Sequence, residues 1–274
     1  MIRDITIGQY YPADSVIHKL DPRVKLAGTL LFIISLFLFS SFFGYVVAAV
    51  FLFGTIKLSK VPLKFIVKGL KAIFVLLLFT VIFNLFLTPG TAIVTLGPLK
   101  ITWEGLRVAV FMAIRLVFLI IGSSLMTLTT TPNQLTDGME KGLGVLKKFH
   151  VPVHEISMMM SIALRFIPIL LEETDKIMKA QSARGADFES GNIIQKAKSL
   201  IPILVPLFVS AFRRANDLAM AMEARCYNGG DGRTKMKPLQ YQKQDRVAYL
   251  VLLLYFVALL GVNLVAKYVL GGIF

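Results

Sequence analysis

The sequence predicts an all-α membrane protein with about five transmembrane helices and one large amphipathic insert. Of its 274 residues, 56% are hydrophobic and only 17% are charged, and the mean hydropathy is +0.72. Soluble domains contain more charged and fewer hydrophobic residues than this, and disordered chains contain far fewer hydrophobic residues still. The apolar residues also gather in runs long enough to cross a hydrocarbon core of about 30 Å.

The first apolar run, residues 24–56, is too long for a single transmembrane helix. At 1.5 Å per residue, one helix over this run would extend roughly 50 Å, well beyond the hydrocarbon core. The sequence Ser-Ser-Phe-Phe-Gly at 40–44 is the natural place for a turn. We therefore expect two short spans, 24–39 and 45–56.

Three further spans are expected along the chain. Residues 72–87 and 104–128 are apolar and are joined by Thr88-Pro89-Gly90 and a hairpin-like stretch, 91–102, that contains Gly97-Pro98. The last span covers 247–265. The fourth and fifth spans are separated by more than a hundred residues that hold most of the charge.

Basic residues in the connections predict the orientation, because Lys and Arg favour the cytoplasmic side. They precede the first span and separate the second from the third: Arg3, Lys19, Arg23, Lys25, Lys57, Lys60, Lys64, Lys68 and Lys71. The turn at 40–44 has none, and the loop 88–103 has only Lys100. We expect a multi-pass protein of the cell (plasma) membrane, with a cytoplasmic N-terminus and insert, and with the tail 268–274 outside.

The insert predicts a cytoplasmic domain of three helical pieces. Thr130 or Thr131 is expected to cap a helix over 133–148, because Pro132 suits a first helical position. Longer helices are expected over 154–184, with a kink at Pro168, and over 192–225, followed by a breaker at 227–232. The predicted domains are 1–128, 129–245 and 246–274.

A repeat marks the ends of the two long insert helices. Ala-Gln-Ser-Ala-Arg-Gly at 180–185 and Ala-Met-Glu-Ala-Arg-Cys at 221–226 share an Ala-x-x-Ala-Arg-small pattern, and their arginines are 41 residues apart. Small neighbours leave each guanidinium unobstructed, and its planar fork suits carboxylates and carbonyls on a partner surface. Two equivalent docking sites are one interpretation. The other is that an arginine near a helix C-terminus simply favours the helix dipole.

Several motifs together resemble one family over nearly the whole chain. They are Leu-Asp-Pro-Arg-Val-Lys at 20–25, Thr-Pro at 131–132, Leu-Arg-Phe-Ile-Pro at 164–168, Ala-Arg-Gly at 183–185 and Ala-Met-Ala-Met-Glu-Ala-Arg at 219–225. With these motifs the chain resembles the transmembrane T component (EcfT/CbiQ-like) of energy-coupling factor (ECF) transporters, which belong to the ATP-binding-cassette (ABC) class.

The resemblance implies a role as well as a fold. In that family two long coupling helices cross, and each presents its end to one of two ABC-type ATPases, A and A′, while the membrane part serves a substrate-binding S component for uptake of vitamins, transition-metal ions or other micronutrients. The implied docking residues are Ala183, Arg184, Gly185, Ala224, Arg225 and Cys226. No cofactor, metal or nucleic acid is implied. Cys226 departs from the family's glycine, so a different helix-end geometry is expected there.

The residues themselves argue against catalysis by this chain. It contains no Gly-Lys dipeptide and therefore no Walker A loop, so any ATP hydrolysis belongs to partner subunits. His150 and His154 are separated by Pro152, which favours a turn with two solvated histidines over a metal site.

A self-contained permease or channel and a scaffold without a transport role are the alternatives to the coupling role. The permease is disfavoured because ion-coupled transporters place carboxylates at membrane depth. Here Arg115 and Asn84 are the strongly polar residues inside predicted spans. Arg115 is expected to face protein or water, either paired with a buried polar group or serving a substrate.

Overall fold

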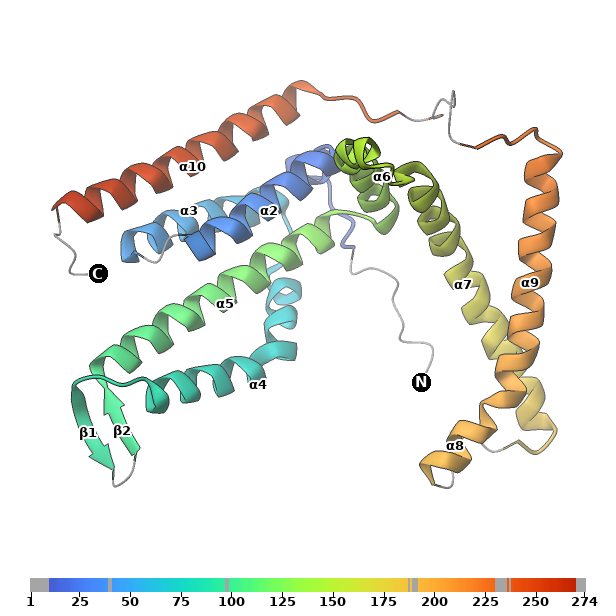
Figure 1. Cartoon of the computed structure of the whole chain (residues 1–274), viewed down its shortest axis with the longest axis horizontal. Coiled ribbons are helices and arrows are strands. Elements are labelled where there is room, and N and C mark those ends of the chain that lie inside the picture. The colour runs from blue at the N-terminus through green and yellow to red at the C-terminus, as the bar shows by residue number, and fades with distance from the viewer. Residues whose placement is uncertain are drawn as a thin grey trace. The chain divides into compact units, whose positions relative to one another are not determined.

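The structure, a computed structural model, describes residues 10–38, 41–96, 99–186, 188, 192–229, 236 and 238–269 (Figure 1). The chain divides into two compact units. Within the described residues, the first unit comprises 10–138 and 239–269, and the second comprises 139–238. The insert expected from the sequence, 129–245, extends beyond the second unit at both ends.

The first unit is built of helices and one hairpin. Its helices are α1 (Val16–Lys19), α2 (Pro22–Leu38), α3 (Phe42–Ser59), α4 (Leu63–Leu87), α5 (Trp103–Thr129), α10 (Lys243–Val269) and the start of α6 (Pro132–Gly142). Strands β1 (Ala92–Leu96) and β2 (Leu99–Thr102) pair antiparallel between α4 and α5, which confirms the predicted hairpin (Figure 1). The Gly97-Pro98 turn lies outside the described residues.

Side-chain caps fix where two of these helices begin. The Ser41 hydroxyl accepts a hydrogen bond from the Gly44 N–H (3.2 Å), so α3 begins directly after the predicted turn. The Thr102 hydroxyl accepts from the Gly105 N–H (3.0 Å) and starts α5 in the same way. Each cap satisfies a backbone donor that has no partner within its own helix. The predicted division of the first apolar run into two helices is therefore confirmed.

The core of the first unit lies where α2, α3 and α10 meet. Tyr255 of α10 stacks on Phe51 of α3 with ring centroids 4.3 Å apart, and its hydroxyl lies 2.8 Å from the Ser35 hydroxyl of α2. Buried side chains surround this contact: Phe32, Leu36, Tyr45, Ala48, Leu52 and Leu259. Helices from the two ends of the sequence thus close one bundle.

Five helical segments among the described residues are long and apolar enough to cross a membrane. They are Phe42–Ser59, Trp103–Thr129, Val153–Ala183, Ile194–Glu223 and Lys243–Val265. The prediction of a mainly helical chain with about five such helices is confirmed, but the members differ. Helix α2, the first predicted span, has 17 residues, one fewer than the shortest of the five segments. Conversely, two of the five segments belong to the predicted insert.

Helix α4 contains a sharp bend. Its arms, Leu63–Lys71 and Ile73–Leu87, meet at 59°, and only together do they match a membrane span in length and composition (Figure 1). The second arm coincides with the predicted span 72–87. The first arm carries the lysines of this region, at positions 64, 68 and 71. The bend therefore separates a basic arm from an apolar one.

The second unit contains the helices of the insert. After α6 come a 3₁₀ segment, η2 (Leu143–Phe149), and the helices α7 (Val153–Ala183), α8 (Ile193–Ser199) and α9 (Ile201–Glu223). Thr131 caps α6 as predicted: its hydroxyl accepts from the Gln134 N–H (3.3 Å), while the Gln134 side chain accepts from the Thr131 N–H (3.1 Å). This reciprocal pair is a capping box.

Two predicted insert helices are interrupted. The helix expected over 133–148 changes from α to 3₁₀ geometry after Gly142. The helix expected over 192–225 breaks at Leu200, because Pro202 has no backbone N–H and cannot continue an existing helix. Pro202 therefore stands in the first turn of α9, where a backbone N–H has no partner within the helix in any case. Helix α7 matches its predicted bounds to within one residue and continues through Pro168. Part of the predicted breaker, 230–232, lies outside the described residues.

Helices α7 and α9 pack against each other in opposite directions. Near the end of α7, the Gln181 amide donates to the carbonyl of Pro202, at the start of α9 (3.4 Å). Further along, Arg214 of α9 forms an ion pair with Glu173 of α7 (3.3 Å). Figure 1 shows the two helices crossing. The expectation of two long, crossing helices in the insert is confirmed.

Candidate functional site

The first arginine-bearing helix end, that of α7, is closed by a Schellman motif. The Gly185 N–H donates to the Ser182 carbonyl and the Ala186 N–H donates to the Gln181 carbonyl, both at 3.0 Å. Gly185 adopts a left-handed backbone with φ of +89°, which glycine accepts without a steric cost. Arg184 is the C-cap residue just before this turn.

The end of α9 repeats this geometry 41 residues later. The Cys226 N–H donates to the Glu223 carbonyl (2.8 Å) and the Tyr227 N–H donates to the Met222 carbonyl (3.0 Å). Arg225 occupies the place of Arg184, and its N–H bonds the same Met222 carbonyl at 3.1 Å. The sequence repeat is therefore a repeat of three-dimensional structure.

Cys226 takes the place that glycine holds in the first motif. Its φ is +55°, in the left-handed region that side chains with a Cβ rarely adopt. The expectation of a different helix-end geometry at Cys226 was wrong, because the hydrogen bonds of the turn match those at Gly185. Because cysteine has a Cβ, this turn strains its backbone by an energy of order 1 kcal/mol or more.

All six predicted docking residues are exposed: Ala183, Arg184, Gly185, Ala224, Arg225 and Cys226. Within the described part of the chain, no hydrogen bond or ion pair joins the guanidinium of Arg184 or Arg225 to another side chain. The flanking alanines and the turn residue add little bulk beside each arginine. Both guanidinium groups, each with five N–H donors, thus face solvent and are open to a planar acceptor such as a carboxylate.

The two arginines lie at opposite ends of the helix pair. Because Gln181 bonds Pro202, the end of α7 lies beside the start of α9, one helix length from Arg225. Twenty-three helical residues at 1.5 Å each put about 35 Å between these ends. The structure therefore does not bring Arg184 and Arg225 together, and each makes a separate site.

Between these ends, α7 and α9 enclose an apolar groove of about 290 Å³. It is lined by Ile162, Phe166 and Leu170 of α7 and by Ala211, Leu218 and Met222 of α9, among others. The Arg214–Glu173 ion pair joins the two helices beside it. Apolar packing and one ion pair thus hold the two arginine-bearing ends on a common support.

The outer surface of the helix pair is strongly apolar. On α9 the exposed large side chains are Ile201, Leu204, Val205, Phe208, Val209, Phe212 and Met220, and on α7 they are Ile156, Met159, Met160 and Ile167. Phe208 and Phe212, one turn apart, are 61% and 68% exposed. On α9 the residues from 201 to 212 recur at helical spacing, and an exposed apolar stripe of this kind marks contact with a partner or with lipid.

Arg115, the cation expected to face protein or water, has a protein partner. Its Nε donates to the hydroxyl of Tyr45 (3.0 Å), and Tyr45 is 5% exposed and stacks on Phe111. The guanidinium also lies 5.5 Å from the centre of the Phe37 ring. Of the two alternatives, pairing with a buried polar group is what the structure shows.

The two histidines of the insert differ in their surroundings. His150 is exposed in the turn before α7, with φ of +60°. His154 is partly buried, and its Nδ1 lies 3.0 Å from Glu140, which also accepts from the Ser157 hydroxyl at 2.9 Å. The expectation of two solvated histidines was therefore wrong for His154, because the start of α7 folds back onto α6.

The Leu-Asp-Pro-Arg-Val-Lys motif forms a buried polar junction. The sequence indicated this motif only as a likeness to a family and did not predict its structural role. The Asp21 carboxylate accepts from the Arg23 backbone N–H (2.9 Å), Nε (3.1 Å) and Nη2 (3.0 Å). Asp245, 1% exposed, accepts from the backbone N–H groups of Asp21 (2.8 Å) and Gln242 (2.7 Å). These contacts join the starts of α2 and α10.

Comparison with known proteins shows which family the chain matches. Residues 13–236 match the family described as CbiQ, "Cobalt transport protein". The chain is 60% identical over 257 residues to the "Energy-coupling factor transporter transmembrane protein EcfT" of Clostridium kluyveri, which covers 91% of this chain and 93% of that protein. The chain belongs to the T-component family of energy-coupling factor transporters. The resemblance inferred from the sequence motifs is thereby confirmed.

Other members of the T-component family are similar over comparable lengths. The identically named protein of Ruminiclostridium cellulolyticum is 57% identical over 89% of this chain and 92% of its own. That of Bacillus subtilis is 48% identical over 95% and 98%. As a T component with several apolar helices, the chain is a multi-pass membrane constituent of a transporter and is not itself an enzyme.

Proposed function

We propose that this T component couples ATP hydrolysis by two partner ABC-type ATPases, A and A′, to a membrane-embedded S component that binds vitamins or other micronutrients for uptake. The observation that carries the proposal is the duplicated helix end, with identical hydrogen bonding 41 residues apart and an exposed arginine in each copy. A helix dipole accounts for one arginine near a helix terminus, but not for the repetition of the whole turn.

Each arginine end docks on one ATPase. A guanidinium flanked by small residues can enter a groove and bind carboxylates or carbonyls there through two parallel N–H donors. Ala183 and Gly185, and correspondingly Ala224 and Cys226, keep the approach clear. The wide separation of the ends fits two ATPases better than one, because a single docking groove would not span one helix length.

The apolar outer face of α9 and α7 binds the S component. Its exposed side chains, Phe208 and Phe212 above all, need an apolar partner or lipid. The neighbouring methionines, Met159 and Met160, are soft and unbranched and can repack against a partner that changes its orientation.

The docking region, proposed as a cytoplasmic coupling domain over 129–245, lies on the side where the connections are basic. The second half of α7 supports a location outside hydrocarbon. Although α7 passes a length-and-hydropathy test for a membrane span, it contains Glu172, Glu173, Asp175, Lys176 and Lys179. Charged groups at that density are costly in a bilayer core.

Charge reversal tests the docking sites. Arg184→Glu and Arg225→Glu should each weaken ATPase binding about tenfold or more, since a carboxylate then faces the proposed acceptors. Because the sites are far apart, the two effects should add in free energy, and the double variant should lose both ATPases. The measurement is co-purification of the ATPases with each variant from membranes, together with substrate uptake in reconstituted vesicles.

Arg213→Glu is the matched control, because Arg213 is an exposed arginine of α9 away from the helix end. It should leave co-purification of the ATPases unchanged. Normal co-purification and uptake in the double variant would contradict the docking assignment. Uptake by the purified chain alone, without ATPases, would instead support the self-contained permease.

Substitution by lysine tests the bidentate geometry. Arg184→Lys and Arg225→Lys keep the charge but replace a planar fork with a single ammonium, so coupling should fall even where some binding remains. The measurement is the ratio of substrate transported to ATP hydrolysed in reconstituted vesicles. An unchanged ratio in both lysine variants would show that charge alone suffices.

A further inference from the structure

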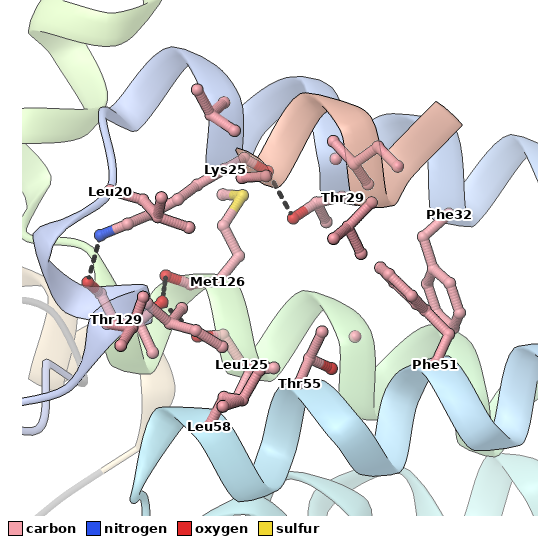
Figure 2. A pocket seen from close by; sticks show the side chains of 18 of the residues that line it. Leu20, Lys25, Thr29, Phe32, Phe51, Thr55, Leu58, Leu125, Met126 and Thr129 are labelled. Atoms are coloured by element: carbon pink, nitrogen blue, oxygen red, sulfur yellow. Dashed lines mark hydrogen bonds between the residues drawn. The ribbon is translucent and has the colours of Figure 1, made fainter. Parts of the chain in front are cut away.

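The first unit contains an apolar cavity of about 240 Å³ between α2, α3, α5 and α10 (Figure 2). Phe32 and Phe51 stand at one end of it and Lys25 at the other (Figure 2). Along α10 its lining runs from Gln244 to Leu252, about 12 Å at 1.5 Å per residue. That length is most of one leaflet of a hydrocarbon core about 30 Å thick.

Four of the five polar side chains in the wall are engaged by the protein, and the fifth, Gln244, is exposed. The hydroxyls of Thr29, Thr55 and Thr129 donate to the carbonyls of their own helices at 2.8 Å. The Lys25 ammonium donates to the carbonyls of His18 (3.0 Å) and Thr129 (2.9 Å). A water molecule needs two or more polar partners, so this cavity is unsuited to a water cluster and suited to an apolar ligand.

The mouth of the cavity is apolar as well. Among the residues that line the cavity, Val16 of α1, Leu58 of α3 and Val247 of α10 are 52%, 57% and 61% exposed, so they mark its open side. Both helices contain segments long and apolar enough to span a membrane. Deeper in the bundle, Phe51 and Tyr255 stack and join the same two helices. In a bilayer the cavity therefore opens sideways, and the medium outside its mouth is lipid.

Basic residues border the same mouth. Lys57 directly precedes Leu58, Lys60 follows two residues later, and Lys243 precedes Gln244; all three are exposed. They stand where α3 ends and α10 begins, so a bilayer crossed by these two helices would have its head groups near them. Lysines at such a surface attract anionic lipid.

We propose that this cavity is a lipid site that takes one acyl chain of an anionic phospholipid. The acyl chain of the lipid enters between α3 and α10 and ends against Phe32 and Phe51. The phosphate of the lipid lies among Lys57, Lys60 and Lys243. The acyl chain fills a void in the helix bundle, and the side chains that line this void gain dispersion contacts that they would otherwise lack. The site uses none of the residues proposed for ATPase docking.

The test is photo-cross-linking of the full chain in vesicles with phosphatidylglycerol that carries a diazirine in its acyl chain. Saturable labelling is expected within 51–58 and 244–252. Ala248→Phe fills the cavity, and it should reduce this labelling about tenfold, the factor that corresponds to 1.4 kcal/mol of affinity. Ala258→Phe, an exposed position on the same helix outside the cavity, should not.

Two outcomes would overturn the proposal. Labelling spread evenly along the exposed side of α10 in the unsubstituted chain would show ordinary bilayer contact, whatever the folding of Ala248→Phe. Equal competition by unlabelled phosphatidylcholine and phosphatidylglycerol would remove the anionic head group from the proposal. Stronger competition by phosphatidylglycerol, with labelling confined to the two segments, would support it.

Discussion

At the scale of single residues, the position least predictable from the sequence is Cys226. A small residue after an arginine predicts a helix end, but cysteine carries no signal for a left-handed backbone, whereas the glycine at 185 does. The fold nevertheless imposes the same turn on both, with φ of +55° and +89°. The arginine positions could be predicted from the repeat, and the equality of the two turns could not.

Cys226→Gly should stabilise the chain, since glycine adopts a positive φ without the Cβ clash. The expected gain is about 1 kcal/mol, or roughly a few degrees in the midpoint of thermal unfolding in detergent. Cys226→Val should have the opposite effect, because a β-branched side chain is strained there. A lower melting temperature for Cys226→Gly would show that the thiol itself stabilises the turn.

At the scale of elements, apolar runs and turn residues predicted most helices to within a few residues. Proline and glycine mark two of the differences: α9 starts afresh at Ile201, with Pro202 in its first turn, and α6 gives way to a 3₁₀ segment after Gly142. A third difference is that α4 begins at Leu63, with a basic arm that the apolar run 72–87 does not include. The junction of α2 with α10 could not be predicted, because Asp21 and Asp245 are 224 residues apart and neither run of sequence indicates the other.

Asp245→Ala should destabilise this junction strongly. It leaves the buried backbone N–H of Asp21 without its acceptor, at a cost of about 1–3 kcal/mol, and removes the acceptor of the N–H of Gln242, an exposed residue that water can reach. Asp245→Asn retains one carbonyl oxygen and should cost less. The measurement is thermal unfolding of the purified chain in detergent, with exposed Asp217→Ala as the control. Equal melting temperatures for Asp245→Ala and the control would contradict a structural role for the junction.

At the scale of the whole molecule, hydropathy alone does not say which helices lie in the membrane. Helix α7 and the segment that runs from α8 through α9 pass the same test of length and composition as α3, α5 and α10. The distinction rests on where the charges fall: the segment of α3 has one lysine, whereas α7 carries seven Asp, Glu, Lys or Arg residues. Labelling at defined positions measures the number of spans and the orientation of the chain directly.

The single cysteine makes that measurement straightforward. Cys226 is exposed, so a membrane-impermeant maleimide should label the chain in inverted vesicles but not in intact cells if the coupling helices are cytoplasmic. Moving the thiol with Cys226→Ser and Tyr268→Cys, a position 83% exposed near the end of α10, should reverse the result, because α10, the last predicted span, separates the two sites. Labelling of both sites from the same side would contradict five spans, and labelling of Cys226 in intact cells would contradict the orientation that the basic connections predict.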